Sequence, residues 1–224
     1  MILSMINENL FITFEKTRHM DGYMKALKKA WHFIWDDNSV WSWIANIAIA
    51  FVLIKFLVYP SLGFILSTTH PVVAVVSESM EHNGNFDKWW KGAQKGYTIT
   101  KDDFMKFPLE NGFNKGDIMI LKGKKPENIR VGDVIVFWSS GISPQTGNRE
   151  PIIHRVVKKW DENGVYYFQT KGDNNPASIS NAYLDETKVS QNQVVGNAVL
   201  RVPLLGYIKI WFVDIIKFLI RLFA

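Results

Sequence analysis

The feature that most constrains this chain is a long apolar run, from Asn38 through Val76, in which Lys55 is the single formally charged residue. About 20 consecutive apolar residues are enough to cross a bilayer as a helix. Pro60 interrupts the run, so the sequence predicts a transmembrane helix over the part before it, Trp41 to Tyr59. Lys55 lies near the end of this helix, where a long side chain can carry its ammonium group to the headgroups. The chain is therefore expected to be anchored in a membrane.

The charges that flank the run predict the orientation of this helix. Basic residues gather ahead of it, whereas the next basic residue after Lys55 is Lys88. The basic residues ahead of the run are Lys16, Arg18, Lys25, Lys28 and Lys29. Because cytoplasmic flanks carry the excess of Lys and Arg, we expect the N-terminus in the cytoplasm and the chain from about His70 onward outside.

The segment before the membrane helix has the pattern of a short amphipathic helix. Between Met20 and Trp35, apolar residues recur at helical spacing with lysines alongside. Asp36-Asp37-Asn38-Ser39 ends this pattern and supplies side chains that can cap the next helix. We therefore expect a cytoplasmic amphipathic segment at residues 1–38, followed by a membrane anchor and its exit at residues 39–67.

From Val72 onward the chain consists of short runs rich in β-branched residues, separated by Gly-Asp and Gly-Lys pairs that are typical of turns. These runs are 72–76, 117–121, 133–137, 152–157, 165–170 and 194–202. They predict a mainly β, mostly antiparallel domain over residues 68–203. The stretch 81–115 is polar and aromatic instead, so we expect an inserted loop or helical lid there. In this lid Thr100 would cap a short helix, and Trp89 and Trp90 would touch lipid.

The tail, residues 204–224, is apolar but carries charges at Lys209, Asp214, Lys217 and Arg221. At about 100° per residue these charges fall within one face of a helix. Burying that face in a bilayer would be costly, so we expect an amphipathic helix at the membrane interface. A second transmembrane pass is the alternative.

Composition narrows the possible chemistry. The chain has no cysteine, which excludes disulfides, thiolate catalysis and zinc held by cysteine. Its net charge is +5, and the basic residues are scattered along the chain. This distribution suits anionic lipid and argues against nucleic acid as a partner. Neither a cofactor nor a metal ion is expected.

Two serines follow the apolar run closely, in Ser77-Glu78-Ser79-Met80. A serine is usually a turn residue, and it becomes a candidate nucleophile when a general base can reach its hydroxyl. His154 stands inside the apolar run 152–157, where a strand would hold its backbone rigid. A histidine at such a position is more often a core residue with satisfied hydrogen bonds. If it faces the hydroxyl of Ser79, His154 would act as the general base.

A carboxylate would then have to hold the imidazole in the correct tautomer. Asp173, in Lys171-Gly172-Asp173-Asn174-Asn175-Pro176, follows a predicted strand at a tight turn. Gly-Asp pairs are also ordinary turn chemistry, as at Gly116-Asp117. The residues alone leave both readings of Asp173 open.

Taken together and in this order, the motifs of the chain resemble those of type I signal peptidases. They are Ser77-Glu78-Ser79-Met80, Gly116-Asp117, Gly132-Asp133, Ile153-His154-Arg155-Val156-Val157, Thr170-Lys171-Gly172-Asp173-Asn174-Asn175, and Val195-Gly196 before Pro203-Leu204-Leu205-Gly206-Tyr207. The resemblance covers roughly residues 41–210. Bacterial members of the family use a lysine base, and the histidine here is similar to the archaeal and endoplasmic-reticulum branch.

The resemblance implies a membrane-bound serine endopeptidase that removes signal peptides from secreted preproteins. In such an enzyme Ser79 attacks the carbonyl of a small residue, His154 takes its proton, and water resolves the acyl-enzyme. The backbone N–H of Ser79, with the hydroxyl of Ser77 or a neighbouring N–H, would bind the oxyanion.

The chain departs from the pattern of this branch at the acid. Members usually carry a second aspartate six residues after the Gly-Asp aspartate, and here that position is Ile179. The next carboxylates are Asp185 and Glu186. Asp173 is therefore the preferred partner of His154, with Asp185, brought back by a longer loop, as the alternative.

The resemblance also implies the partners and the location. Preproteins bearing signal peptides and the lipid bilayer are the expected partners, and accessory subunits or the secretion translocon are suggested as well. Runs 72–76 and 133–137 are expected to pair with an extended peptide. The location would be the cell membrane or the endoplasmic-reticulum membrane, with one membrane pass and the catalytic domain on the extracytoplasmic side. A non-catalytic membrane-anchored β domain that binds or scaffolds secreted proteins is the alternative.

Overall fold

The computed structural model of the protein describes residues 22–207 together with residues 211, 215 and 218. The chain divides into two compact units, Met1–Pro60 and Ser61–Ala224. Most of the helix predicted at 204–224 lies outside the described residues, as do Met20 and the residues before it.

In the first unit, two helices meet at the predicted break. Residues 22–35 are helical, and α2 (Val40–Leu53) begins after Ser39, whose hydroxyl accepts a hydrogen bond from the N–H of Ser42 at 3.2 Å. The hydroxyl of Ser42 in turn donates to the carbonyl of Phe33 at 2.6 Å. Ser39 thus caps α2, as the sequence predicts, and Ser42 within α2 ties it to the preceding helix.

The apolar helix continues beyond its predicted end at Tyr59. A π-helical turn (Ile54–Val58) links α2 to α3 (Tyr59–Leu66), which makes one helix of 27 residues that contains an 18-residue stretch with a mean hydropathy of 2.2. A proline lacks the N–H that an α-helix needs and crowds the carbonyl four residues earlier, and a wider turn just before Pro60 accommodates both effects. The helix is long and apolar enough to cross a membrane, and it passes through Pro60 instead of ending at Tyr59 as predicted.

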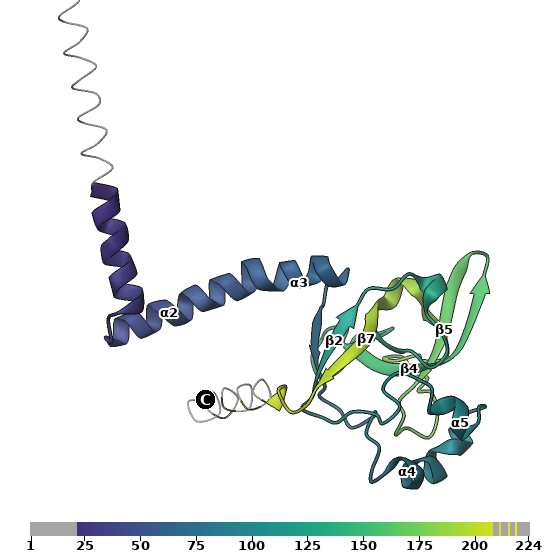
Figure 1. Ribbon diagram of the computed structural model, residues 1–224. Helices are drawn as coiled ribbons and strands as arrows, with labels where there is room; N and C mark the ends of the chain where they lie inside the picture. The colour runs from purple at the N-terminus through teal and green to yellow at the C-terminus, as the bar shows by residue number, and fades with distance from the viewer. Residues whose placement is uncertain (1–21, 208–210, 212–214, 216–217, 219–224) are drawn as a thin grey trace, which may run out of the picture. The chain divides into compact units, whose positions relative to one another are not determined.

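The second unit contains a seven-stranded sheet in which every strand pair is antiparallel. Its strands are β1 (Val72–Ala74), β2 (Ile118–Lys122), β3 (Val134–Trp138), β4 (Pro151–Glu162), β5 (Val165–Lys171), β6 (Val189–Ser190) and β7 (Val194–Val202). The strand order is β1-β2-β7-β3-β4-β5-β6, and Figure 1 shows β2 beside β7 and β4 beside β5. The prediction of a mainly β, antiparallel domain is confirmed.

The middle strand β3 shows how this sheet is buried. Val134 and Val136 belong to one apolar cluster, whereas Ile135 and Phe137 belong to another. Since successive side chains of a strand point to opposite faces, the sheet is covered on both faces at this strand. A strand buried in this way reads in the sequence as a continuous apolar run, which is what residues 134–137 are.

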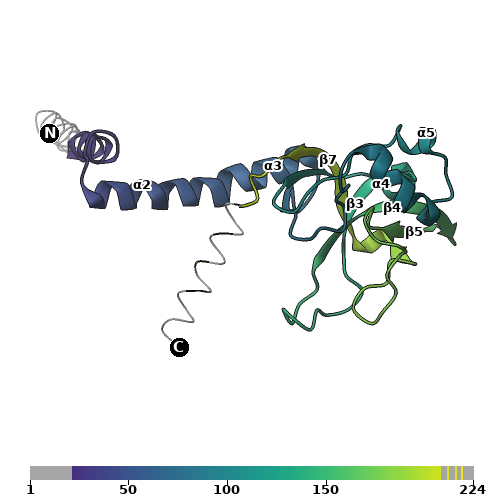
Figure 2. The same cartoon turned by 90° about the horizontal axis from the view of Figure 1, so that it is seen from below.

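The inserted stretch, residues 81–115, contains short helices and is called the lid below. It contains α4 (Phe86–Ala93), a 3-10 turn (Gln94–Gly96) and α5 (Lys101–Phe104), and Figures 1 and 2 show α4 and α5 close together beside the sheet. Further 3-10 turns lie at Pro126–Asn128 and Gln191–Gln193. The hydroxyl of Thr100 accepts from the N–H of Asp103, so this residue caps α5 as predicted.

The two tryptophans of the lid point inward. Trp89 and Trp90 are only 6% and 7% exposed, and they pack with Phe104 in an aromatic cluster. The expected contact of these residues with lipid is therefore wrong. Aromatic residues are typical of both a membrane interface and a protein core, and here the core is where they lie.

Candidate active site

The segment that carries Ser79 is held at both of its ends. On one side the N–H of Val75 donates to the carbonyl of Asp117, and the N–H of Gly116 donates to the carbonyl of Val75, both at 2.9 Å. On the other side Met80 is buried, and its carbonyl accepts from the N–H of Phe113 at 3.1 Å. The residues between these anchors, including Ser79, are thereby fixed at the surface of the domain.

The structure brings Ser79 and His154 together. Nε2 of His154 lies 2.9 Å from the hydroxyl oxygen of Ser79, and the imidazole itself is buried on β4. The hydroxyl oxygen of Ser77 lies 3.1 Å from that of Ser79. A nucleophile within hydrogen-bond reach of a base is the arrangement that serine hydrolysis requires.

The carboxylate on the far side of the imidazole is Glu186. Its Oε1 lies 2.5 Å from Nδ1 of His154 and accepts from the hydroxyl of Thr170 at 2.9 Å. Its Oε2 accepts from the N–H of Ile179, also at 2.9 Å, and the side chain is fully buried. Three hydrogen bonds therefore fix this carboxylate, which can hold the imidazole with its proton on Nδ1.

Neither Asp173 nor Asp185 contacts the imidazole. Asp173 accepts from the guanidinium of Arg155 at 2.7 to 3.2 Å, and the carboxylate of Asp185 accepts from the N–H and the hydroxyl of Thr187. His154 and Arg155 are neighbours on β4, so their side chains point to opposite faces of the sheet, and each meets a different acid. Asp173 lies on the face of Arg155.

The sequence does contain a signal for Glu186. Leu184 and Glu186 are buried, whereas Asp185 and Thr187 lie toward solvent. In extended backbone, residues two apart share a face, so an acid two residues after an apolar leucine is the one expected to point inward. The alternation in this short segment distinguishes Glu186 from Asp185.

Asp173 is the centre of a buried charged cluster beside the site. Besides Arg155, it accepts from the hydroxyl of Tyr97 at 2.8 Å and contacts Nε2 of His82 at 3.0 Å. Burial raises the pKa of Asp173, but the charge of Arg155 and the hydrogen bonds of His82 and Arg155 outweigh it, so the pKa lies well below its usual value. Burial and the nearby Asp173 raise the pKa of Tyr97. The aspartate is thus ionised and Tyr97 is neutral.

The same cluster joins the lid to the sheet. Arg155 also donates to the carbonyls of Pro108 and Leu109 in the lid, at 2.8 and 2.9 Å, and its guanidinium lies 4.7 Å from the ring centroid of Phe104. Lys171 donates to the carbonyls of Gly172 and Asn175 and lies over the ring of Tyr97. Burial lowers the pKa of Lys171 to about 8.

The two other histidines of this unit, His82 and His70, make contacts elsewhere. The ring of His82 stacks on Trp89 with centroids 3.5 Å apart, and Nδ1 of His70 lies 2.9 Å from the hydroxyl oxygen of Thr69. Among the described histidines, His154 is the one within hydrogen-bond reach of Ser79. The site therefore combines a serine, a histidine and a glutamate.

Comparison with known proteins gives this arrangement a context. No protein-family model matches the chain. Over 118 residues it is 33% identical to the human "Signal peptidase complex catalytic subunit SEC11C", an alignment that spans 52% of this chain and 58% of the human protein. The chain is thus similar to signal peptidase catalytic subunits. The SEC11 subunit of Scheffersomyces stipitis is 27% identical over 165 residues, which are 73% of this chain and 78% of the yeast protein. The SEC11 subunit of Colletotrichum graminicola is 30% identical over 104 residues, 46% of this chain and 57% of the fungal protein.

The chain thus matches somewhat over half the length of the SEC11C proteins of the dog, human and mouse. The resemblance inferred from the motifs is confirmed by these relatives.

Proposed function

We propose that the protein is a membrane-bound serine endopeptidase that removes signal peptides from secreted preproteins. The observation that carries this proposal is the continuous contact from the hydroxyl of Ser79 through both nitrogens of His154 to the carboxylate of Glu186. The kinship with signal peptidase catalytic subunits supports the substrate class.

In the proposed mechanism, His154 takes the proton of the Ser79 hydroxyl as the serine oxygen attacks the carbonyl carbon of a small residue at the cleavage site. Nδ1 of the imidazole keeps its proton against Glu186, which stabilises the imidazolium that forms. The imidazolium then gives its proton to the leaving amine, and an acyl-enzyme remains on Ser79. Water, activated by the same imidazole, releases the cleaved signal peptide.

Glu186 takes the role for which Asp173 was the preferred residue and Asp185 the alternative. Its support is the contact with Nδ1 of His154, which neither aspartate makes. Asp173 instead has a positioning role, because the turn that follows it holds the nucleophile's own backbone. The N–H of Asn174 donates to the carbonyl of Ser79 at 2.8 Å.

The oxyanion of the tetrahedral intermediate would be bound by the backbone N–H of Ser79 and the hydroxyl of Ser77. The proximity of the two hydroxyls, 3.1 Å apart, supports this role for Ser77. A donor at this position stabilises charge that develops in the transition state, and such a donor typically contributes about 10²–10³ in rate.

The substrate would bind as an added strand at β1. This strand stands at the end of the strand order and pairs with β2, while its other edge pairs with no strand among the residues described. β3, which the sequence also offered for this role, pairs on one side with β4 and on the other with β7, and therefore has no open edge. An extended peptide along β1 would run toward Ser79, which lies five residues after the end of β1 in the chain.

We place the protein in the cell membrane or the endoplasmic-reticulum membrane, with its β domain on the extracytoplasmic side. The apolar helix Val40–Leu66 and the lysines ahead of it support this topology. Accessory subunits or the secretion translocon are further proposed partners, since the relatives are subunits of a complex.

The experiment that tests the function is cleavage of a preprotein with an Ala-x-Ala site by the protein reconstituted in liposomes. Cleavage after the last alanine is expected from the wild type and not from Ser79→Ala. Thermal melting of both proteins establishes that each is folded. A folded wild type that cuts no preprotein, alone or with added membrane extract, would overturn the proposal in favour of a non-catalytic binding role.

A further inference from the structure

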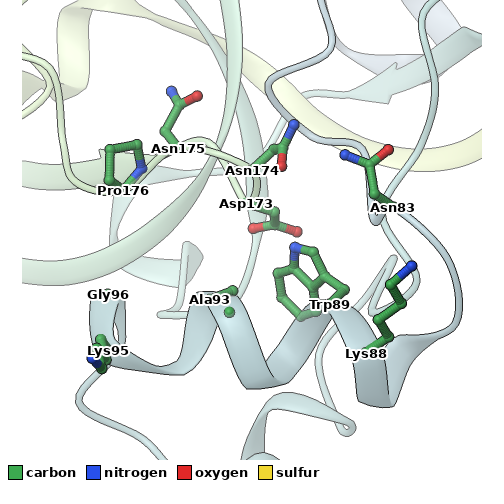
Figure 3. A pocket seen from close by; sticks show the side chains of 11 residues that line it. Asn83, Lys88, Trp89, Ala93, Lys95, Gly96, Asp173, Asn174, Asn175 and Pro176 are labelled. Carbon is green, nitrogen blue, oxygen red and sulfur yellow. The ribbon is translucent and has the colours of Figure 1, made fainter.

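A pocket of about 520 Å³ lies beside the candidate active site, between α4 of the lid and the turn at residues 173–176 (Figure 3). The mechanism proposed above makes no use of it. Asn174 connects the two sites, because it lines the pocket while its N–H donates to the carbonyl of Ser79 and its side-chain amide donates to the carbonyl of Glu78. The pocket and the nucleophile's backbone are therefore joined through a single residue.

The wall formed by α4 and the 3-10 turn that follows it presents hydrogen-bond donors. Lys88 and Lys95 line the pocket, and neither forms an ion pair with any acid in the described part of the chain. In Figure 3 the side chain of Lys88 extends along one side of the pocket toward Asn83. Two positive charges on the lining of one pocket favour a ligand with negative charge.

Trp89, which also lines the pocket, supplies a further donor that is buried. The residue is 6% exposed, and its indole nitrogen has no hydrogen-bond partner among the residues described. In Figure 3 this nitrogen is on the side of the ring that faces the turn at Asp173 and Asn174. A buried N–H without a partner is costly, so an acceptor that reaches this nitrogen gains a hydrogen bond that the free protein lacks.

The carboxylate that borders the pocket does not oppose an anion there. The side chain of Asp173 is buried, and its oxygens are already engaged by Arg155, His82 and Tyr97. Its charge is balanced by the guanidinium, so the uncompensated charge near the pocket is that of the two lysines. The pocket thus suits a carboxylate, the anion that a polypeptide carries on its Asp and Glu side chains.

We propose that this pocket is a subsite that binds an acidic side chain of the substrate polypeptide, close to the bond that is cut. The inference rests on the proposed peptidase function, which it deepens by adding a preference for an acidic residue near the cleavage site.

Binding of labelled peptides tests this subsite without relying on catalysis. Peptides that span an Ala-x-Ala site, with Asp or its neutral isostere Asn at each position around the scissile bond in turn, are titrated against the Ser79→Ala protein in uncharged phosphatidylcholine liposomes. At one position or at two adjacent ones, the Asp peptide is expected to bind about fivefold tighter than the Asn peptide, which is the effect of roughly 1 kcal/mol. Equal affinity of the Asp and Asn peptides at every position would overturn the proposal.

Variants of the two pocket lysines identify the pocket as the cause of the preference. Changing both lysines, Lys88→Gln with Lys95→Gln, should reduce the ratio of the two affinities to near one. Lys91→Gln removes one positive charge from α4, beside Lys88 but outside the pocket, and it should keep the wild-type ratio. If Lys91→Gln abolishes the preference as fully as the double variant does, the effect is that of net charge and the pocket is not the site.

Gly92 offers a second, steric variant. It lines the pocket, and a Cβ added there would meet no atom within 4 Å. Gly92→Met should therefore fold, fill the pocket and abolish the preference for Asp. A preference that survives a folded Gly92→Met protein would contradict the proposal.

Two further outcomes are distinguishable. A wild type that cleaves no preprotein, beside a Ser79→Ala protein that still prefers the Asp peptide, would refute the peptidase function and leave the pocket as a peptide-binding site. Anionic phosphatidylglycerol vesicles, added as competitor, distinguish a lipid headgroup from a peptide. If the lysine variants lose binding to these vesicles while no peptide shows a preference, the pocket takes lipid and the proposal is overturned.

Discussion

Ser77 is a test of the proposed oxyanion site at the scale of one residue. Its hydroxyl is exposed and lies 3.1 Å from that of Ser79, so removing it costs little packing. Ser77→Ala should lower kcat by about 10²-fold with a much smaller change in KM, because the lost interaction belongs to the transition state. Steady-state kinetics on the preprotein measures both values. Wild-type kcat in this variant would mean that other donors bind the oxyanion.

The lowered pKa of Lys171 predicts that the free energy of unfolding depends on pH. Burial lowers its pKa to about 8 in the folded protein, compared with 10.5 as the ordinary value, so between these limits the unfolded chain binds more protons. The penalty for burying the charge is full below pH 8 and disappears as the pH rises through this range. The wild type should therefore gain on the order of 2 kcal/mol relative to Lys171→Met between pH 7 and pH 9.5.

Chemical denaturation of the two proteins at both pH values measures this difference. Lys122→Met, which removes an exposed lysine of β2, controls for the change in net charge. A constant difference between wild type and Lys171→Met across this range would show that the ammonium is not penalised by burial.

The sequence predicted two of the three residues that meet at the candidate site. Ser79 and His154 each stand in a motif of their own, and the structure places them within hydrogen-bond reach. Glu186 stands in no motif. Predicting that its side chain points inward requires knowing the face of a short extended segment, and a shift of one residue reverses that face. Asp173 was preferred as the partner of His154 because of its place in the Gly-Asp motif. In the structure Asp173 instead pairs with Arg155, because both side chains lie on the same face of the sheet.

At the scale of elements, the contact between lid and sheet depends on Asp173. Asp173→Asn would leave the guanidinium of Arg155 buried without its counter-charge, which should destabilise the domain by about 3–5 kcal/mol. Since the folded-state pKa of Asp173 is lowered, its contribution is full above about pH 4 and is lost as the pH falls below that value.

Thermal melting of the variant checks this loss, and its dependence on pH provides a second reading. Asp103→Asn, which removes an exposed partner of Lys106 in the same lid, is the matched control and should melt close to the wild type. An Asp173→Asn protein as stable as this control would contradict the role given to the buried pair.

Elements with a clear period were predictable, and those defined by tertiary contacts were not. The strand runs at 118–122, 134–138 and 194–202 agree with prediction within a residue or two, since β-branched runs between Gly-Asp turns carry their own signal. β6 has two residues and is too short to show a pattern. The burial of Trp89 depends on its packing against Phe104 and His82 in the lid. No periodic pattern in the sequence predicts these contacts.

At the scale of the whole molecule, the apolar helix Val40–Leu66 accounts for the expected attachment to a membrane. Val52 lies on this helix with its side chain exposed. An aspartate near the centre of a membrane helix costs about 2.5–3.5 kcal/mol for insertion, so Val52→Asp should lower the fraction that resists extraction by alkaline carbonate, and Val52→Leu should not. Equal retention of both variants would mean that the helix does not lie in the bilayer core.

The most direct test of the proposed active site is a comparison of kcat/KM for the wild type, Glu186→Gln and Asp185→Asn on the same preprotein, with thermal melting as the check on folding. Glu186→Gln should lose about 10⁴-fold, as expected when the group that sets the tautomer of the base is made neutral, while Asp185→Asn stays near the wild type. A folded Glu186→Gln protein with wild-type kcat/KM, or a loss confined to Asp185→Asn, would contradict the assignment of Ser79, His154 and Glu186 as one catalytic unit.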